Sequence, residues 1–206
     1  MSEWIVTRKS EGVLEIEIRR SQTNNALDGP MYTAAAEAVL SGEADPEVRV
    51  LLLRGQDDLF ISGTDLQDIA LLPSNGISDL DSGPPLAFTQ ALGETTKPVV
   101  AAIKGLAIGV GTILLLYGDV VYASADAQFQ LHLVAPGLCP DFSSSLLLPQ
   151  CEGRQATAEM FMLSRPFGAA LAHAYGLVSY LVERGEVDAL ALERARSLAA
   201  SQAAAP

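Results

Sequence analysis

The chain has 206 residues, and 49% of them are apolar, which is enough to build the core of one domain. A net charge of −12 argues against nucleic acid or an anionic membrane surface as a partner. The longest apolar run, Gly105 to Gly118, is too short to span a bilayer, and the first residues lack a signal-peptide pattern. The two cysteines lack the spacing of a metal site. We therefore expect a cytoplasmic protein of one domain that holds no metal ion.

The first part of the chain predicts alternating strands and helices. Apolar residues alternate with polar ones over 12–18, which indicates a half-buried strand paired with an antiparallel partner. Asp28-Gly-Pro30 supplies a helix cap and a first-turn proline, and Asp45-Pro46 ends that helix. The continuous apolar run Val48–Leu53 predicts a strand covered on both faces. The polar, glycine-bearing segment Leu72–Pro85 is typical of a loop.

The second half continues the alternation. Strands are predicted at Pro98–Ile103 and Asp119–Tyr122, with an apolar helix at about Val110–Tyr117 between them. This order favours a parallel crossover, because a helix carries the chain back to start the next parallel strand. A last strand is predicted at Val178–Val182 and a terminal helix at Val187–Ala200. The fold class is therefore α/β.

One glycine-bearing turn lies in Phe60-Ile-Ser-Gly-Thr-Asp-Leu66. Gly63 permits a sharp turn and the close approach of a ligand to the main chain. Asp65 can cap a short following helix by accepting its free amides. The amide of Thr64 would then point outward as a free donor. By itself, however, the segment is more typical of an ordinary capped turn.

A second such turn lies in Lys104-Gly-Leu-Ala-Ile-Gly-Val-Gly111, between a buried strand and an apolar helix. The amide of Val110 falls in the first turn of that helix, where it has no internal acceptor and the helix dipole adds partial positive charge. A developing oxyanion would be stabilised there. The glycine spacing matches neither a dinucleotide-binding fingerprint nor a Walker loop. Tight packing of the helix on the strand is the simpler explanation for these glycines.

With Asp141 in Gly137-Leu-Cys-Pro-Asp-Phe-Ser-Ser-Ser145, the two turns resemble the crotonase superfamily of enoyl-CoA hydratases and isomerases. The resemblance extends from about Trp4 to Val182 and includes Asn25-Ala-Leu27, Arg54-Gly55, Asp119 and Gly176-Leu-Val178. It implies a crotonase-like spiral of ββα units and an acyl-CoA ligand. Trimers or dimers of trimers are implied as well. We expect one domain over 1–206, with its core at about 4–182 and the usual C-terminal helical part shortened to 183–206.

The resemblance also implies which residues form the site. The amides of Thr64 and Val110 would form an oxyanion hole for the thioester oxygen. The coenzyme A and thioester channel would be lined by Ala26, Ser62, Gly63, Asp65, Leu66 and Gly109. The acyl pocket would be lined by Ile113, Leu133 and Phe142. No cofactor is implied apart from the coenzyme A of the substrate itself.

The acids that are present indicate the reaction. Hydratases of the superfamily carry two glutamates, at the places where this chain has the apolar residues Ile113 and Leu133, so hydration of a double bond is disfavoured. Asp141 lies where Δ3,Δ2-enoyl-CoA isomerases carry a catalytic glutamate and dienoyl-CoA isomerases an aspartate. The dienoyl enzymes also need a second acid at the place of Leu133. The pattern therefore predicts a 3-enoyl-CoA to trans-2-enoyl-CoA isomerase with Asp141 as its base.

Three alternatives remain open from the sequence. Asp141 could instead cap the helix predicted near Ser143. The chain could be an acyl-CoA-binding homologue without catalysis. A hydrolase or dehalogenase-type reaction would use Asp141 as a nucleophile, but Leu86 and Leu133 stand where a superfamily dehalogenase has its supporting histidine and tryptophan. Lastly, some basic residues are candidates for the coenzyme A phosphates, although solvent exposure is the favoured interpretation: Arg54, Lys97 and Lys104.

Overall fold

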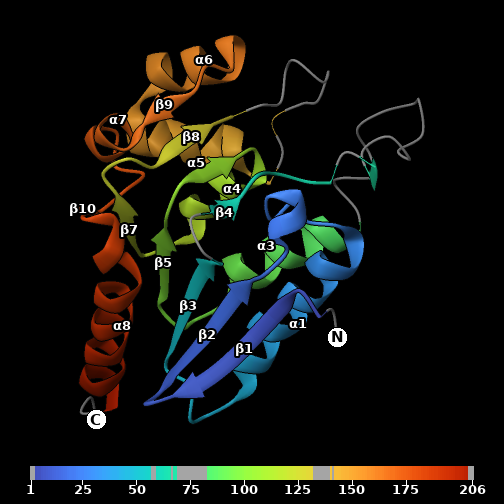
Figure 1. Cartoon of the computed structure of the whole chain (residues 1–206), viewed down its shortest axis with the longest axis vertical. Coiled ribbons are helices and arrows are strands. Elements are labelled where there is room, and N and C mark those ends of the chain that lie inside the picture. Colours follow the sequence, from blue (N-terminus) through green and yellow to red (C-terminus); the bar gives the residue numbers. More distant parts are fainter. Residues whose placement is uncertain are drawn as a thin grey trace.

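Two β-sheets of unequal size organise the chain in a computed structural model, which describes residues 3–56, 59–65, 67–68, 83–131, 140 and 142–203 (Figure 1). The larger sheet has the strand order β1-β2-β3-β5-β7-β10. Its strands are β1 Ile5–Ser10, β2 Val13–Ile18, β3 Val50–Gly55, β5 Val99–Ile103, β7 Val120–Ser124 and β10 Tyr180–Val182. β1 and β2 are antiparallel, and the pairs from β2 to β10 are parallel. The predicted antiparallel partner of β2 and the parallel crossover from β5 to β7 are thus confirmed.

The smaller sheet has the order β4-β6-β8-β9 and is built from short strands. These are β4 Leu59–Ile61, β6 Leu106–Ile108, β8 Gln128–Gln130 and β9 Phe167–Gly168. After β3, β5 and β7 of the larger sheet, the chain enters β4, β6 and β8 of the smaller one, and helices follow. This repeated strand–strand–helix step is the predicted ββα spiral. Because the steps are parallel, the turns after β4 and β6 lie at the same edge of the smaller sheet.

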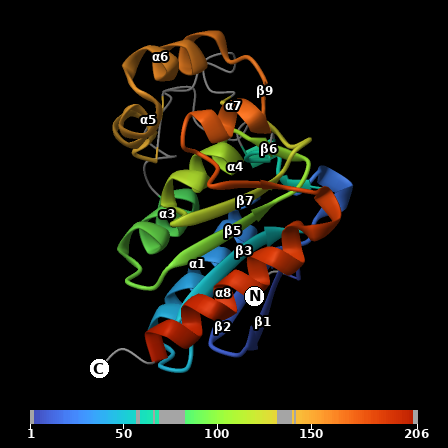
Figure 2. The ribbon, with the colours of Figure 1, turned by 90° about the vertical axis from the view of Figure 1, so that its left-hand side faces the viewer.

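Helices cover both faces of the larger sheet and surround the smaller one (Figure 2). One face of the larger sheet packs against α1 in the main core. The other face packs against α8 in a separate apolar cluster. The α-helices are α1 Gly29–Ala44, α3 Pro84–Glu94, α4 Val110–Ile113, α5 Ser144–Glu152, α6 Arg154–Leu163, α7 Ala169–Ala174 and α8 Val187–Ala203. The 3-10 helices are η1 Ser21–Thr23, η3 Leu114–Tyr117 and η4 Arg184–Glu186.

Strand β2 departs from the prediction, because it is buried on both faces rather than on one. The residues expected to face solvent, Val13, Glu15 and Glu17, lie on the side that α8 covers. Val13 packs in the apolar cluster under α8. The two carboxylates pair with the Arg54 guanidinium at 3.2 Å each, which compensates the burial of their charge. The alternation in the sequence of β2 thus separates two faces that lie in different buried environments.

Three other expectations can be compared with the structure. Asp28 caps α1 by accepting a hydrogen bond of 2.9 Å from the Met31 amide, as predicted. The helix expected at Val110–Tyr117 is a four-residue α-helix that continues as a 3-10 helix. The predicted end of the loop at Pro85 is wrong, because Pro84 and Pro85 form the first turn of α3. Proline is tolerated there, since the N–H that it lacks has no acceptor within the helix. Much of that predicted loop lies outside the described residues.

Within the described ranges, no helix is both long enough and apolar enough to cross a bilayer. Nor do three histidine, cysteine, aspartate or glutamate side chains of that part of the chain gather closely enough to hold a metal ion.

Candidate active site

The Thr64 turn follows β4 and leaves its amide without an acceptor among the described residues. Thr64 forms an isolated parallel bridge with Leu27. In this bridge the Leu27 N–H donates to Gly63 O at 2.9 Å, and the Asp65 N–H donates to Leu27 O at 2.8 Å. Leu27 thus bonds to the main chain of the residues before and after Thr64. The N–H of Thr64 itself therefore points to the opposite side. The turn is made possible by Gly63, whose φ is 117°.

The Val110 turn joins β6 to α4 and presents a second free amide. Gly109, with φ 56°, precedes the helix, and its carbonyl accepts from Thr112 N and Ile113 N at 3.0 and 3.1 Å. Gly109 N donates to Gln130 O at 2.8 Å, which ties the turn to β8. No acceptor for the Val110 N–H is found in the described part of the chain, as expected at the first position of a helix.

The two turns lie against each other. β4 pairs with β6 on the side away from Leu27, through Ile61 and Ala107, so the free amide of Thr64 faces the Val110 turn. A Cβ built on Gly109 would lie 3.8 Å from the Gly63 Cα. One built on Gly111 would overlap the Ile61 carbonyl oxygen and lie 3.0 Å from its Cβ. Glycine is therefore required where α4 meets β4, and this contact keeps the two turns close together.

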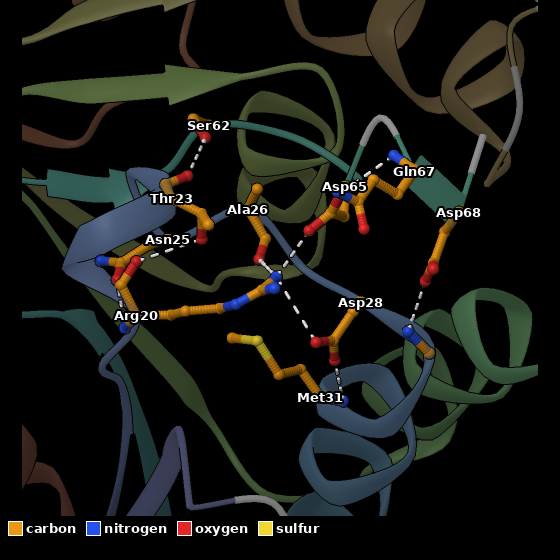
Figure 3. Close-up of polar contacts among 11 residues, drawn as sticks. Arg20, Thr23, Asn25, Ala26, Asp28, Met31, Ser62, Asp65, Gln67 and Asp68 are labelled. Atoms are coloured by element: carbon orange, nitrogen blue, oxygen red, sulfur yellow. Dashed lines mark hydrogen bonds and ion pairs between the residues drawn. The ribbon is translucent and has the colours of Figure 1, made fainter. Parts of the chain in front are cut away.

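A network of polar side chains surrounds the Thr64 turn (Figure 3). The Arg20 guanidinium bonds to the Ala26 carbonyl oxygen at 3.0 Å and to Asp65 Oδ2 at 2.7 Å. The other carboxyl oxygen of Asp65 accepts from the Gln67 amide at 2.9 Å, which is the predicted capping contact. The Tyr32 hydroxyl, fully buried in α1, lies 2.7 Å from the Thr64 hydroxyl. Thr64 is therefore held through its side chain as well as through its main chain.

The charge of Asp65 is stabilised in place. The Gln67 amide, and after it the Arg20 guanidinium, hold the pKa of the Asp65 carboxyl below its usual value, although burial opposes them. Its side chain is 15% exposed and that of Arg20 is 17% exposed. Asp65 therefore remains a carboxylate at neutral pH and is bound into the turn, which makes it unsuited to act as a free base.

The structure places the other predicted site residues as follows. Ile113 is buried in α4, and Phe142 is buried at the turn before α5. The Tyr117 hydroxyl donates to the Phe142 carbonyl oxygen at 2.7 Å, so the residue after Asp141 is tied to the helical segment that Val110 begins. Ala26, Ser62, Gly63, Asp65 and Gly109 all belong to the two turns and to the segment bonded to them. Asp141, Leu66 and Leu133 lie outside the described residues.

The basic residues considered for the coenzyme A phosphates have internal partners, so neither free solvation nor a free cation describes them. Lys97 Nζ donates to the Gly42 and Asp45 carbonyl oxygens at 2.6 and 2.7 Å. Lys104 Nζ donates to Asp188 Oδ2 at 2.7 Å. Arg54 pairs with the carboxylates beneath α8. Their positive charges stabilise helix ends and the sheet rather than an open surface.

The sequence reading missed Arg20 and Tyr32. Arg20 lies just after β2. Its position shortly before the Asn25-Ala-Leu27 segment was the signal that could have marked it as a candidate site residue. Its carboxylate partner is 45 positions away, and no local pattern links the two. Tyr32 falls within the apolar periodicity of α1, so the sequence pattern predicts a core side chain and does not indicate a partner for its hydroxyl. Both residues meet the Thr64 turn only in the folded chain, because Arg20 reaches it from the segment after β2 and Tyr32 reaches it from α1.

Chemically, two free amides on adjacent turns can donate to one carbonyl oxygen and stabilise it as negative charge develops. The apolar side of α4 adjoins one of them, since Ile113 is 1% exposed. The ββα spiral and the paired amide-bearing turns define a protein of the crotonase superfamily. Comparison with known proteins narrows this class.

The family model for enoyl-CoA hydratase/isomerase matches residues 8–205. The chain is 31% identical over 202 residues to 1,2-epoxyphenylacetyl-CoA isomerase of Escherichia coli, an alignment that covers 97% of this chain and 77% of that protein. It is 33% identical over 201 residues to carnitinyl-CoA dehydratase of Salmonella typhi, covering 97% and 74%. A solved structure from Magnetospirillum magneticum AMB-1, named as an enoyl-CoA hydratase/carnithine racemase, superimposes with a TM-score of 0.92 at 38% identity, covering 97% and 77%. The chain belongs to the enoyl-CoA hydratase/isomerase family, whose enzymes process acyl-CoA thioesters.

Proposed function

We propose that the protein is an isomerase that shifts the double bond of a 3-enoyl-CoA to give the conjugated trans-2-enoyl-CoA. The observation that carries this proposal is the pair of amides at Thr64 and Val110, which lack an acceptor among the described residues and lie on turns that approach each other at Gly63 and Gly109. Such donors suit an enolate oxygen, which becomes more negative in the transition state than in the bound thioester. The buried Ile113 beside them supports isomerisation over hydration, because it offers no group that could activate water.

In the proposed mechanism Asp141 is the single base, assigned from its place in the sequence. Its carboxylate takes a proton from C2 of the substrate, and the electrons of the C2–H bond delocalise into a dienolate. The thioester oxygen carries the negative charge and accepts hydrogen bonds from the amides of Thr64 and Val110. The Asp141 carboxyl group then returns the proton to C4, which leaves the double bond between C2 and C3. Proton and electrons balance, so the reaction consumes no co-reactant.

The names of the relatives support more than one reaction of an acyl-CoA thioester. The Escherichia coli relative is named as an isomerase of 1,2-epoxyphenylacetyl-CoA, which supports isomerisation in general without specifying a double-bond shift. The Salmonella typhi relative is named as a dehydratase, which favours addition or removal of water as the second candidate function. The apolar residues Ile113 and Leu133 weigh against that candidate, because they replace the two glutamates expected of a hydratase.

The decisive experiment supplies a 3-enoyl-CoA and follows the conjugated product by its ultraviolet absorbance and by mass spectrometry. Asp141→Asn should lower turnover by about a hundredfold to ten-thousandfold, which is the usual contribution of a general base, while acyl-CoA binding persists. Asp126→Asn is the matched control, because Asp126 is an exposed acid that pairs with Arg184. Full turnover in Asp141→Asn would refute the assignment of the base.

Two further assays separate the alternatives. An acyl-CoA should raise the melting temperature of an enzyme and of a non-catalytic binding protein alike, but only the isomerase converts 3-enoyl-CoA. Formation of a 3-hydroxyacyl-CoA from trans-2-enoyl-CoA would instead support the hydratase. By analogy with the superfamily, we also propose that the protein is cytoplasmic and forms a homotrimer or hexamer. Light scattering would measure the mass of this assembly.

A further inference from the structure

Arg20 links the two chain segments that form the bridge at Thr64. We propose that Arg20 is a positioning residue that fixes the direction of the Thr64 amide toward the substrate carbonyl. This inference rests on the proposed function, because it concerns the same oxyanion-binding site. Arg20 does not touch the reacting atoms in this account; it acts through Asp65 and Ala26.

The direction of the Thr64 amide depends on two main-chain hydrogen bonds. Leu27 binds Gly63 O and Asp65 N at 2.9 and 2.8 Å, which leaves the N–H of Thr64 on the other side. Because Thr64 and Leu27 form an isolated bridge, no neighbouring pair of described residues continues the ladder. A single bridge can rotate more easily than a strand pair, so something else must prevent this rotation.

Arg20 supplies that restraint on both sides of the bridge (Figure 3). Its guanidinium bonds to the carbonyl oxygen of Ala26, the residue before Leu27, at 3.0 Å. It also bonds to the carboxylate of Asp65, the residue after Thr64, at 2.7 Å. It lies 3.4 Å from Oδ2 of Asp28, whose other carboxyl oxygen, Oδ1, caps α1. A single nitrogen, Nη1, therefore joins the residues next to the two bridge partners to each other and to the start of a helix.

The Arg20 backbone is itself anchored to the strand that enters the turn. The Arg20 amide donates to Asn25 Oδ1 at 2.7 Å. Asn25, fully buried, donates from its side chain to the Leu59 and Phe60 carbonyl oxygens of β4 at 3.2 and 3.0 Å. The contacts thus close a ring from β4 through Asn25 and Arg20 to Asp65. Such a ring restrains the turn more than one surface ion pair would.

The proposal predicts a catalytic defect with a particular form. Without the guanidinium, the Asp65 carboxylate loses its partly buried cation, and the Thr64 turn can rotate about the bridge. A misaimed amide stabilises the enolate oxygen less, and this loss is larger in the transition state than in the bound thioester. For Arg20→Met we expect kcat to fall by about tenfold to a hundredfold, with a much smaller change in KM.

The test compares Arg20→Met and Arg20→Lys with Arg19→Met. Arg19 is the matched control, because it is the adjacent arginine and pairs with Glu17 on the sheet at 3.1 Å. Besides kcat and KM, infrared difference spectra of a saturated, isotope-labelled acyl-CoA report the stretching frequency of the bound thioester carbonyl. Strong amide donors lower that frequency. We expect the lowering in the wild type and in Arg19→Met, part of it in Arg20→Lys, and little in Arg20→Met.

The outcomes distinguish the two proposals. If the wild type isomerises 3-enoyl-CoA and Arg20→Met retains both its kcat and its carbonyl shift, the positioning role is overturned and the proposed function stands. If the wild type shows neither turnover nor a carbonyl shift, the proposed function fails together with the inference. Should Arg20→Met not fold, Arg20→Lys and the isosteric Asp65→Asn provide the readout. An unchanged carbonyl shift in both would overturn the positioning role.

Discussion

The two amide-bearing turns are held by different physical means. The Thr64 turn depends on side chains: the Arg20 guanidinium, the Asp65 carboxylate and the Tyr32 hydroxyl all contact it. The Val110 turn depends on the backbone and on close packing, because Gly109 bonds to β8 and Gly111 leaves no space against Ile61. One donor is therefore fixed by charge and hydrogen bonds, and the other is fixed by steric exclusion.

This difference determines how each turn responds to change. Charged and polar contacts respond to pH, to salt and to the loss of single side-chain groups. A packed glycine responds to added volume, and it has no group that titrates. Substitutions can therefore disturb one donor while leaving the other in place.

The largest effect on stability is expected for Gly111→Ala, which adds volume to the packed Val110 turn. The added Cβ would overlap the Ile61 carbonyl oxygen, so β4 and α4 must separate. Overpacking of this kind costs about 1–3 kcal/mol of stability, and we expect a value near the upper end because a backbone atom is the obstacle. Urea unfolding measures the loss, and turnover should fall with it. Gly185→Ala is the control, since nothing lies within 4 Å of the Cβ it would add. Equal stability of the two variants would contradict the packing argument.

A smaller effect is expected for Tyr32→Phe, which attacks the side-chain-held turn. The substitution removes the hydroxyl that lies 2.7 Å from the Thr64 hydroxyl and leaves the ring buried. Losing such a hydrogen bond costs about 1 kcal/mol. Thermal unfolding measures it, with Tyr180→Phe as the control because Tyr180 is 55% exposed. If both variants lose the same stability, the Tyr32 hydroxyl does not support the turn.

Acid should weaken the Thr64 turn selectively. The pKa of Asp65 in the folded protein lies below its ordinary value of 3.8, because of the Gln67 amide and then Arg20. The carboxylate therefore adds stability at neutral pH, and this contribution is lost as the pH falls through the folded pKa. The stability difference between the wild type and Asp65→Asn should shrink toward zero in acid. Urea unfolding across that pH range would show a constant difference if Asp65 were not coupled to folding.

The smallest effect lies outside both turns, at Glu152 on the last turn of α5. Burial raises the pKa of its carboxyl group from 4.5 to about 7. The nearby Thr157 hydroxyl opposes this shift of the pKa, and it donates to the Gly153 carbonyl oxygen at 2.9 Å. Both carboxyl oxygens are buried and have no hydrogen-bond partner among the described residues.

Because the folded-state pKa of Glu152 is raised, the folded protein keeps the proton at pH values where the unfolded chain has released it. Glu152 therefore favours folding in mild acid, and this advantage is lost as the pH rises through about 7. Glu152→Gln should be slightly more stable than the wild type above neutral pH, with unchanged turnover. Melting temperatures at about pH 5 and about pH 8 test this. A destabilised variant at the higher pH would show that the carboxylate has a partner.

Sequence alone determined the elements whose signal is local. Continuous apolar runs identified β3 and β5, because strands buried on both faces lose their alternation. Asp28 and Pro30 identified the start of α1 through capping chemistry. Glycines identified both amide-bearing turns, and the combined motifs identified the superfamily. The short strands β4, β6, β8 and β9 gave no such signal, because two or three residues are too few to show a period.

Only the tertiary structure decided how these local pieces constrain one another. Glu15 and Glu17 are buried because α8 covers them and Arg54 pairs with them, which no alternation pattern records. Arg20 meets Asp65 across 45 positions because the segment after β2 lies beside the segment after β4. A sequence pattern reports the preferences of neighbours along the chain. The direction of a backbone amide depends on groups that folding brings together from distant segments, and their contacts exist only in the folded protein.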